Sequence, residues 1–266
     1  MPILHAIVLG LVQGLTEFLP VSSSGHLAIV PWLFHWKELT HNDHLNQTFD
    51  VALHIGTFVG ALAYFWRDIW DIVSNRARHR LGLLLIVATI PAGIAGVLFE
   101  DALSHPSEWL IGLMLIVFGL VLYVADRQTA TRNAEMGEEP FGMRDALTLG
   151  FAQVLALQPG VSRSGITISA GRFVGFDRES AARISFLMAL LVVGGAGAFK
   201  TLEVFTGDGL GPGLAAPFAW GMLTSAISGA LAVWGLLRLV KTRSFTPFVI
   251  YRVVAGLAII AIAAAR

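Results

Sequence analysis

The 266-residue sequence contains no cysteine and few charged residues, and these two features exclude several classes of protein and site. Without cysteine the chain can form neither disulfides nor thiolate metal sites. Only 14% of its residues are charged, against about 25% in typical soluble domains. The formal net charge is zero, which argues against a nucleic-acid partner. With 55% hydrophobic residues and a mean hydropathy of +0.71, the composition predicts an integral membrane protein.

Six apolar segments are long enough to cross a bilayer, for which a helix needs about 20 residues. We expect these spans at 50–67, 82–100, 108–125, 181–200, 217–237 and 246–265. Segments 5–36 and 144–172 are also apolar, but Pro, Gly and Ser interrupt each near its middle. Because their halves are too short to span, we predict two re-entrant helical hairpins. We expect neither a soluble domain nor a removable signal peptide.

Basic residues predict how these segments run through the membrane. Thirteen of the eighteen Lys and Arg residues fall within four stretches, 67–80, 127–144, 172–183 and 238–243. Loops rich in Lys and Arg stay in the cytoplasm, so these stretches are expected on the inner side. The second hairpin then enters from the cytoplasm and returns there, whereas the first enters and leaves on the outer side.

An internal repeat relates residues 5–26 to residues 145–166, with an offset of 140. Nine of the 22 aligned positions are identical, and both copies have a Ser-x-Ser-Gly core at the break. Each copy precedes three predicted spans, so the second half should be inverted relative to the first. Broken helices at membrane depth must line a cavity or be buried in protein, so we expect the two breaks to meet near the midplane.

The predicted fold is therefore an all-α polytopic membrane protein with two inverted-topology repeats. Each repeat is a re-entrant helical hairpin followed by three transmembrane helices. The chain forms one integral membrane domain, 1–266, with repeats 1–126 and 144–266 and a cytoplasmic linker, 127–143.

The two copies differ where polar side chains gather. Glu17, Ser23 and His26 of the first copy correspond to Leu157, Arg163 and Ile166 of the second. The first copy thus supplies acid, base and hydroxyl groups, and the second supplies a cation. An arginine at mid-membrane costs at least about 2.5–3.5 kcal/mol and needs an anionic partner. Guanidinium groups pair well with phosphate oxygens, so Arg163 predicts a phosphate site.

Further polar residues around the two breaks complete a candidate phosphate cradle. Helices that restart after each break present free backbone N–H groups to an anion. Gln13 lies one turn before Glu17 on the same helix face, where it can donate or accept hydrogen bonds but not titrate. The candidate phosphate contacts are Gln13, Ser22, Ser24, Ser162, Ser164 and Thr167.

The first copy also carries the groups that a reaction needs. Ser23 is a candidate nucleophile if an adjacent base takes its proton, and His26 is a candidate proton carrier. Glu17 could orient His26, act as the base, or share a hard divalent cation such as Mg²⁺ or Ca²⁺ with phosphate oxygens. The residues leave open whether Ser23 or His26 is the nucleophile and whether a metal takes part.

Each residue also has a structural explanation when it is taken alone. The serines cap helices and permit close packing, Glu17 suits an ion relay in a carrier, and His26 suits an interhelical hydrogen bond. Their occurrence together at equivalent breaks of a repeat favours a functional site. Weaker candidates lie elsewhere: Asp50 and His54 open the first span, Arg252 is expected to snorkel to the cytoplasmic face, and His35, His41 and His44 belong to a polar outer segment.

Over essentially its whole length the chain resembles undecaprenyl-diphosphatases of the bacitracin-resistance type. The resemblance rests on "QGLTEFLPVSSSGH" near the start, "PGVSRSGIT" past the middle and "FTPFVIYR" near the end. It implies hydrolysis of undecaprenyl diphosphate in the bacterial plasma membrane, at a site that opens to the outer face. It also implies catalytic roles for Glu17, Ser23, His26 and Arg163.

The sequence departs from the family pattern at two positions. Gln13 stands where family members often have a second Glu, which puts a two-carboxylate metal site in doubt. His54 stands where Gln is common. The rival interpretation is a flippase for an anionic polyprenyl phosphate lipid, since inverted repeats serve alternating access. The sequence leaves the oligomeric state open.

Overall fold

The computed structural model describes residues 1–40, 42–103, 107–132, 141–206 and 213–266. The first half contains α1 (Ile3–Phe18), α2 (Ser23–Leu33), α3 (Lys37–Thr40), α4 (Asp43–Ser74), the 3₁₀ helix η1 (Arg76–Arg78), α5 (His79–Leu103) and α6 (Glu108–Asp126). The second half contains α7 (Met143–Val154), the 3₁₀ helix η2 (Leu155–Leu157), α8 (Arg163–Phe173), α9 (Arg178–Thr206), α10 (Ala215–Val240) and α11 (Thr246–Ala265). Within these ranges the only β pairing is an isolated bridge between Arg132 and Phe176, so the described chain is all-α.

Six helices in the described part of the chain are long and apolar enough to cross a membrane. They are α4, α5, α6, α9, α10 and α11, which correspond to the six predicted spans. The chain is therefore a multi-pass membrane protein. Helix α4 begins at Asp43, before the predicted span at 50–67. The prediction missed these first turns because they are polar and a search for apolar segments does not detect them.

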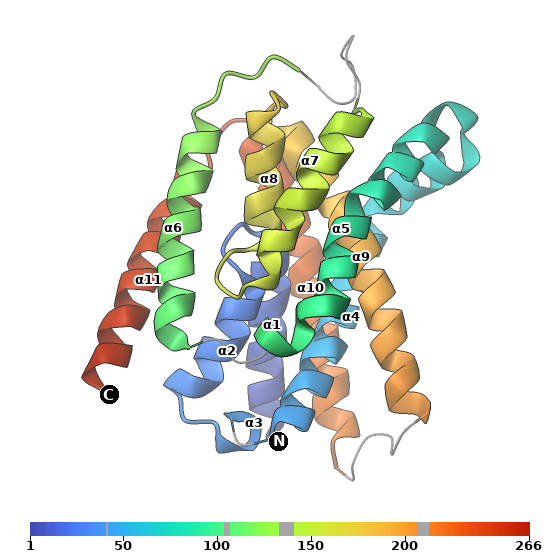
Figure 1. Cartoon of the computed structure of the whole chain (residues 1–266). Coiled ribbons are helices and arrows are strands. Elements are labelled where there is room, and N and C mark those ends of the chain that lie inside the picture. The colour runs from blue at the N-terminus through green and yellow to red at the C-terminus, as the bar shows by residue number, and fades with distance from the viewer. Residues whose placement is uncertain (41, 104–106, 133–140, 207–212) are drawn as a thin grey trace.

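Two helical hairpins enter the bundle from opposite ends. Helices α1 and α2 occupy its lower half in Figure 1 and helices α7 and α8 its upper half, with the connecting loops in between. At 1.5 Å per residue, the 16 residues of α1 extend only about 24 Å, short of the roughly 30 Å hydrocarbon core. The other three hairpin helices are shorter, with 11 or 12 residues. None of these four helices is therefore long enough to cross the hydrocarbon core by itself.

Small residues let the first hairpin pack tightly against the spans. A methyl group added at Gly10 would lie 2.4 Å from the carbonyl oxygen of Gly221, and one at Gly14 would lie 2.5 Å from that of Ser225. Helix α1 therefore contacts the backbone of α10, which in turn packs against α4. Close backbone approach at small residues is the usual way in which membrane helices associate. This packing holds the end of α1, and with it Glu17, inside the bundle.

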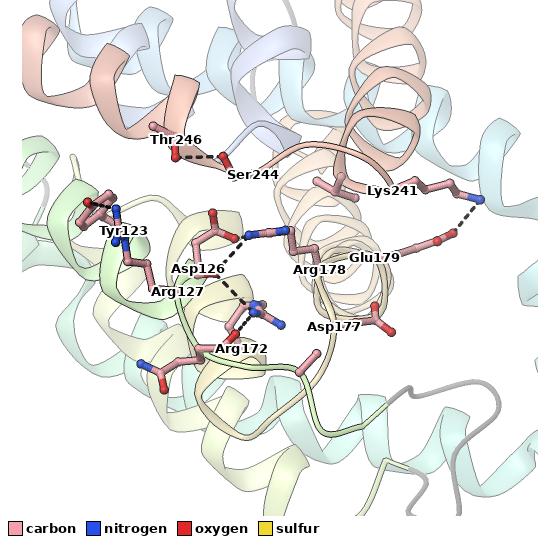
Figure 2. A pocket seen from close by; sticks show the side chains of 13 residues that line it. Tyr123, Asp126, Arg127, Arg172, Asp177, Arg178, Glu179, Lys241, Ser244 and Thr246 are labelled. Carbon is pink, nitrogen blue, oxygen red and sulfur yellow. Dashed lines mark hydrogen bonds and ion pairs between the residues drawn. The ribbon is translucent and has the colours of Figure 1, made fainter.

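The basic stretches gather at one end of the molecule. Arg127, Arg172, Arg178 and Lys241 come from three of the four predicted cytoplasmic stretches and line one polar cavity of about 740 Å³ (Figure 2). Arg178 pairs with Asp126 at 2.5 Å, and Lys241 pairs with Glu179 at 3.0 Å. Acidic partners therefore neutralise much of the positive charge in this cavity.

Candidate functional site

The loops that join the helices of the two hairpins lie against each other. Ser22 Oγ accepts a hydrogen bond of 3.1 Å from the backbone N–H of Gly160. Ser164 Oγ donates a hydrogen bond of 3.0 Å to the carbonyl of Leu19. The two breaks therefore meet, as the sequence predicts. Two of the predicted phosphate contacts thus also join the hairpins to each other.

Ser22 and Ser162 occupy equivalent positions of the repeat and adopt the same unusual backbone conformation. Each has φ of 75°, a left-handed region that costs a residue with a side chain about 1–3 kcal/mol. Each also caps the helix that follows it: Ser22 Oγ accepts from the N–H of Gly25, and Ser162 Oγ accepts from that of Gly165. The same strained junction is thus built twice, and the caps help to maintain it.

Arg252 is fully buried between the junctions, so the prediction that it snorkels to the surface is wrong. Among the described residues its guanidinium donates to backbone carbonyls alone, those of Pro20, Met114, Leu115, Gly160 and Val161, at 2.9–3.4 Å. Pro20 and Gly160 are equivalent in the repeat, so one side chain joins both breaks. The broken helices leave carbonyls without helical partners, and these oxygens stabilise the buried cation in place of a carboxylate.

Glu17 lies at the centre of the polar cluster beside these junctions. Its Oε1 accepts a hydrogen bond of 2.9 Å from Arg163, across the two hairpins. Its Oε2 accepts from Gln13 Nε2 at 2.9 Å and from the Ser23 hydroxyl at 2.6 Å. The carboxylate is 2% exposed, so these partners replace the water that a buried charge loses. The structure thereby brings together four of the predicted site residues.

Arg163 retains an unused hydrogen-bond donor beside this cluster. Its Nη2 pairs with Glu17, whereas its Nη1 is buried and has no partner among the described residues. A buried donor without a partner costs about 1–3 kcal/mol or more when it is charged. The side chain is still 21% exposed, so an anion can reach the guanidinium and pair with it once it turns.

His26 lies at the edge of the site and does not contact Glu17. Its Nδ1 lies 2.7 Å from the carbonyl of Ser22 and its Nε2 lies 2.6 Å from the hydroxyl of Tyr251. Because a carbonyl only accepts, Nδ1 carries the proton and Nε2 accepts from Tyr251. The expectation that Glu17 orients His26 is therefore wrong. The Ser22 carbonyl and Tyr251 orient the ring instead.

The remaining predicted phosphate contacts differ in what they touch. Ser24 is exposed, and its hydroxyl lies 3.5 Å from that of Ser22. Ser162 and Ser164 hydroxyls lie 3.2 Å apart. Thr167 is fully buried, and its hydroxyl lies 2.5 Å from that of Ser185 on α9, so it contributes to helix packing.

His54 contacts the site more closely than its sequence position indicates. Its Nε2 lies 3.4 Å from Glu17 Oε2, and its Nδ1 lies 2.7 Å from the carbonyl of Asp50. The Nδ1 proton is used on that carbonyl, so His54 donates to Glu17 only when Nε2 is also protonated. One indication of this contact is present in the sequence, because His54 is a polar residue on an otherwise apolar stretch of α4. Tyr251 lies within the quoted stretch FTPFVIYR, but only the packing of α11 places it beside His26.

Among the described residues, this site offers few side chains that could ligate a metal. Within the described ranges no group of three or more His, Asp or Glu side chains could ligate a cation together. Glu17 is the carboxylate of the cluster, and both of its oxygens already accept hydrogen bonds from protein donors. The structure does not test a metal site at the predicted outer histidines, because His41 and the side chain of His44 lie outside the described residues.

Comparisons with known proteins match nearly the whole chain. The family model described as "Bacitracin resistance protein BacA" matches residues 6–258. A protein from Geobacter sulfurreducens named "Undecaprenyl-diphosphatase" is 47% identical over 279 residues, covering 100% of both chains. Proteins of the same name are 45% identical in Pelobacter propionicus, over 98% of this chain and 97% of the relative, and 43% identical in Pelotomaculum thermopropionicum, over 100% and 98%.

Arg252→Met should destabilise the protein strongly, because it removes the donor from loop carbonyls that face no water. Each buried carbonyl left unpaired costs about 1–3 kcal/mol, so the melting temperature in detergent should fall well below that of the wild type. Arg252→Lys, with three donors in place of five, should have a melting temperature between those of the wild type and Arg252→Met. Arg127→Met is the control, since that exposed guanidinium pairs with Tyr123 at the surface. Equal melting of Arg252→Met and the control would contradict this role.

Proposed function

The chain belongs to the bacitracin resistance protein BacA family, and from this premise we propose how it hydrolyses undecaprenyl diphosphate to undecaprenyl phosphate and inorganic phosphate. The reaction regenerates the lipid carrier of peptidoglycan synthesis and removes the diphosphate that bacitracin sequesters. The observation that carries the mechanism is the cluster of the buried Glu17 with the half-buried Ser23 and Arg163, which joins both hairpins.

Ser23 is the nucleophile in this mechanism. Its hydroxyl already donates to Glu17 at 2.6 Å, so the carboxylate is placed to accept the proton as the oxygen attacks. Ser23 Oγ bonds to the terminal phosphorus, the bond from that phosphorus to the bridging oxygen breaks, and undecaprenyl phosphate leaves. Glu17 passes the serine proton to the departing undecaprenyl phosphate and is a carboxylate again. A water molecule then attacks the phosphoserine and gives its proton to Glu17, which passes it to the Ser23 oxygen as the bond from that oxygen to phosphorus breaks, so phosphate is released and the Ser23 hydroxyl is restored.

Arg163 binds the phosphate and stabilises the charge that develops on it. With the substrate present its guanidinium turns partly from Glu17 towards the phosphate oxygens, and the unpartnered Nη1 gains an acceptor. His54 remains beside Glu17 and, when both of its ring nitrogens carry protons, replaces part of this lost pairing. Gln13 keeps the carboxylate in place throughout, and Ser22, Ser24, Ser162 and Ser164 supply further hydroxyls at the junction.

His26 is the alternative nucleophile, but its hydrogen bonds favour a supporting role. Its Nε2 is engaged with Tyr251, and an attack by this atom would first have to break that bond. Ser23, by contrast, faces a base without any rearrangement. We assign His26 and Tyr251 to one edge of the substrate site, where they can exchange protons with the phosphate.

We further propose that repeats 1–126 and 144–266 are related by an inverted-topology symmetry, with a cytoplasmic linker at 127–143. The matching φ angles of Ser22 and Ser162 and the hairpins entering from opposite ends support this relation. Such symmetry would also suit a lipid flippase. The enzyme is favoured because Glu17 and Ser23 have no counterparts in the second copy, where Leu157 and Arg163 stand.

The orientation is also a proposal, and the basic residues support it. They gather at the end of the bundle where α8 ends and α9 begins, which positive-inside bias places in the cytoplasm. The first hairpin, with the catalytic set, then opens to the outer face of the bacterial plasma membrane. A diphosphate lipid released by wall synthesis on that face would reach the site without crossing the membrane.

Ser23→Ala should abolish phosphate release from undecaprenyl diphosphate by the detergent-purified protein, because the attacking oxygen is lost. Ser244→Ala, at the far end of the bundle, is the matched control and should keep wild-type turnover. Phosphate release would be measured in detergent, where no transport can be scored. Normal hydrolysis by Ser23→Ala would exclude Ser23 and make His26 the candidate nucleophile.

Arg163→Lys should lower kcat by about 10²–10³-fold, the typical loss when one donor to a developing charge is removed. Lysine keeps the positive charge but not the planar fork that pairs with Glu17 and the phosphate together. Steady-state kinetics on the folded variant would measure this loss. Turnover close to that of the wild type would contradict the role of Arg163 in binding the phosphate.

A single cysteine introduced at Asn42 should react with a membrane-impermeant maleimide in intact spheroplasts, and one at Asn75 should not. These residues flank α4 and so lie on opposite sides of the membrane. The native chain has no cysteine, so the signal is unambiguous. Labelling of Asn75→Cys from outside, with Asn42→Cys protected until the membrane is broken, would reverse the orientation.

A further inference from the structure

We propose that an apolar groove between α4, α5 and α9 binds the polyprenyl chain of the substrate. This inference rests on the proposed function, because it assigns a place to the hydrophobic part of the same lipid. The groove has a volume of about 600 Å³, within the range of ligand sites. The three helices pack against one another, and they lie side by side at the right of Figure 1.

The groove begins next to the catalytic cluster. His54, 3.4 Å from Glu17, is followed one and two turns later on the same face of α4 by Phe58 and Leu62, which line the groove. Phe58 lies against α9 at Gly194, where an added methyl group would be only 2.8 Å from its ring. The near end of the groove therefore lies within a few turns of Glu17 along α4, which is within reach of the chain of a lipid whose phosphate is held there.

The length and chemistry of the groove suit a long hydrocarbon chain. It follows α4 from Phe58 to Val73, about 22 Å at 1.5 Å per residue. Aliphatic side chains, Phe58 and glycines line it. Its one titratable lining residue, His79, lies at the far end, where its Nε2 donates to the Val73 carbonyl at 2.9 Å. A polyprenyl chain needs no hydrogen bonds, so such walls leave none of its groups unsatisfied.

The groove should act mainly by holding the chain in one position. Surrounding lipid tails are as apolar as the groove, so burial there gains little from the hydrophobic effect. What the groove adds is van der Waals contact with one chain, which keeps the diphosphate beside Ser23. Filling the groove should therefore raise KM and leave kcat nearly unchanged, the signature of lost uniform binding.

Gly195 allows a sharp test, because it lines the groove and a methyl group added there meets no atom within 4 Å. Gly195→Leu would thus project into the groove without a clash at its Cβ. Gly235 on α10 is the matched control, since its added methyl group also meets nothing within 4 Å and it does not line the groove. Both changes replace a helical glycine by leucine in apolar surroundings. Leu83→Trp, at the far end of the groove and 64% exposed, is a second blocking variant if Gly195→Leu does not fold.

Steady-state phosphate release from undecaprenyl diphosphate in detergent would be compared among variants with equal melting temperatures. Gly195→Leu should raise KM by about tenfold relative to Gly235→Leu, the lower range of what an apolar pocket contributes to discrimination. Equal KM values for the folded groove variant and Gly235→Leu would overturn the proposal that the groove binds the polyprenyl chain. Absence of phosphate release by the wild type would instead overturn the proposed function, so the two failures are distinguishable.

Discussion

A bilayer supplies no water to a broken helix, and this constraint governs the centre of the molecule. Two helices of each hairpin end at a break inside the bundle, so their terminal N–H and C=O groups must find partners inside the protein. Ser22, Ser162 and Ser164 supply some of these partners, and Arg252 supplies others by donating to carbonyls of both breaks. Together with the Glu17–Arg163 ion pair, these contacts hold the two hairpins against each other.

The meeting of the hairpins also explains why the site is asymmetric. The junctions share φ angles, caps and position in the repeat, so the scaffold is the same on both sides. The proposed reaction requires different groups on the two sides, a nucleophile with its base and a cation for the phosphate. Placing Glu17 and Ser23 in one copy and Arg163 in the other satisfies this need and links the copies through one ion pair.

Patterns along the chain predicted much of this arrangement and missed what depends on distant packing. The spans, both hairpins and the meeting of the breaks followed from apolar length, interruption and repetition. The grouping of Glu17 with Ser23 and Arg163 followed from the repeat. The burial of Arg252 did not, because it depends on α11 packing against α6, and its place six residues into a span suggested the surface. His26 was wrongly linked to Glu17, because sequence proximity does not show that Tyr251 lies nearer.

An experimental structure of the Ser23→Ala variant with intact undecaprenyl diphosphate would test the central claim most directly. The account predicts that the terminal phosphate contacts Arg163 at the junction of the two hairpins, with its phosphorus next to residue 23. It also predicts that the Arg252 contacts to both breaks remain. A diphosphate bound elsewhere, such as in the polar cavity of Arg127 and Arg178, with Arg163 still paired to Glu17, would contradict it.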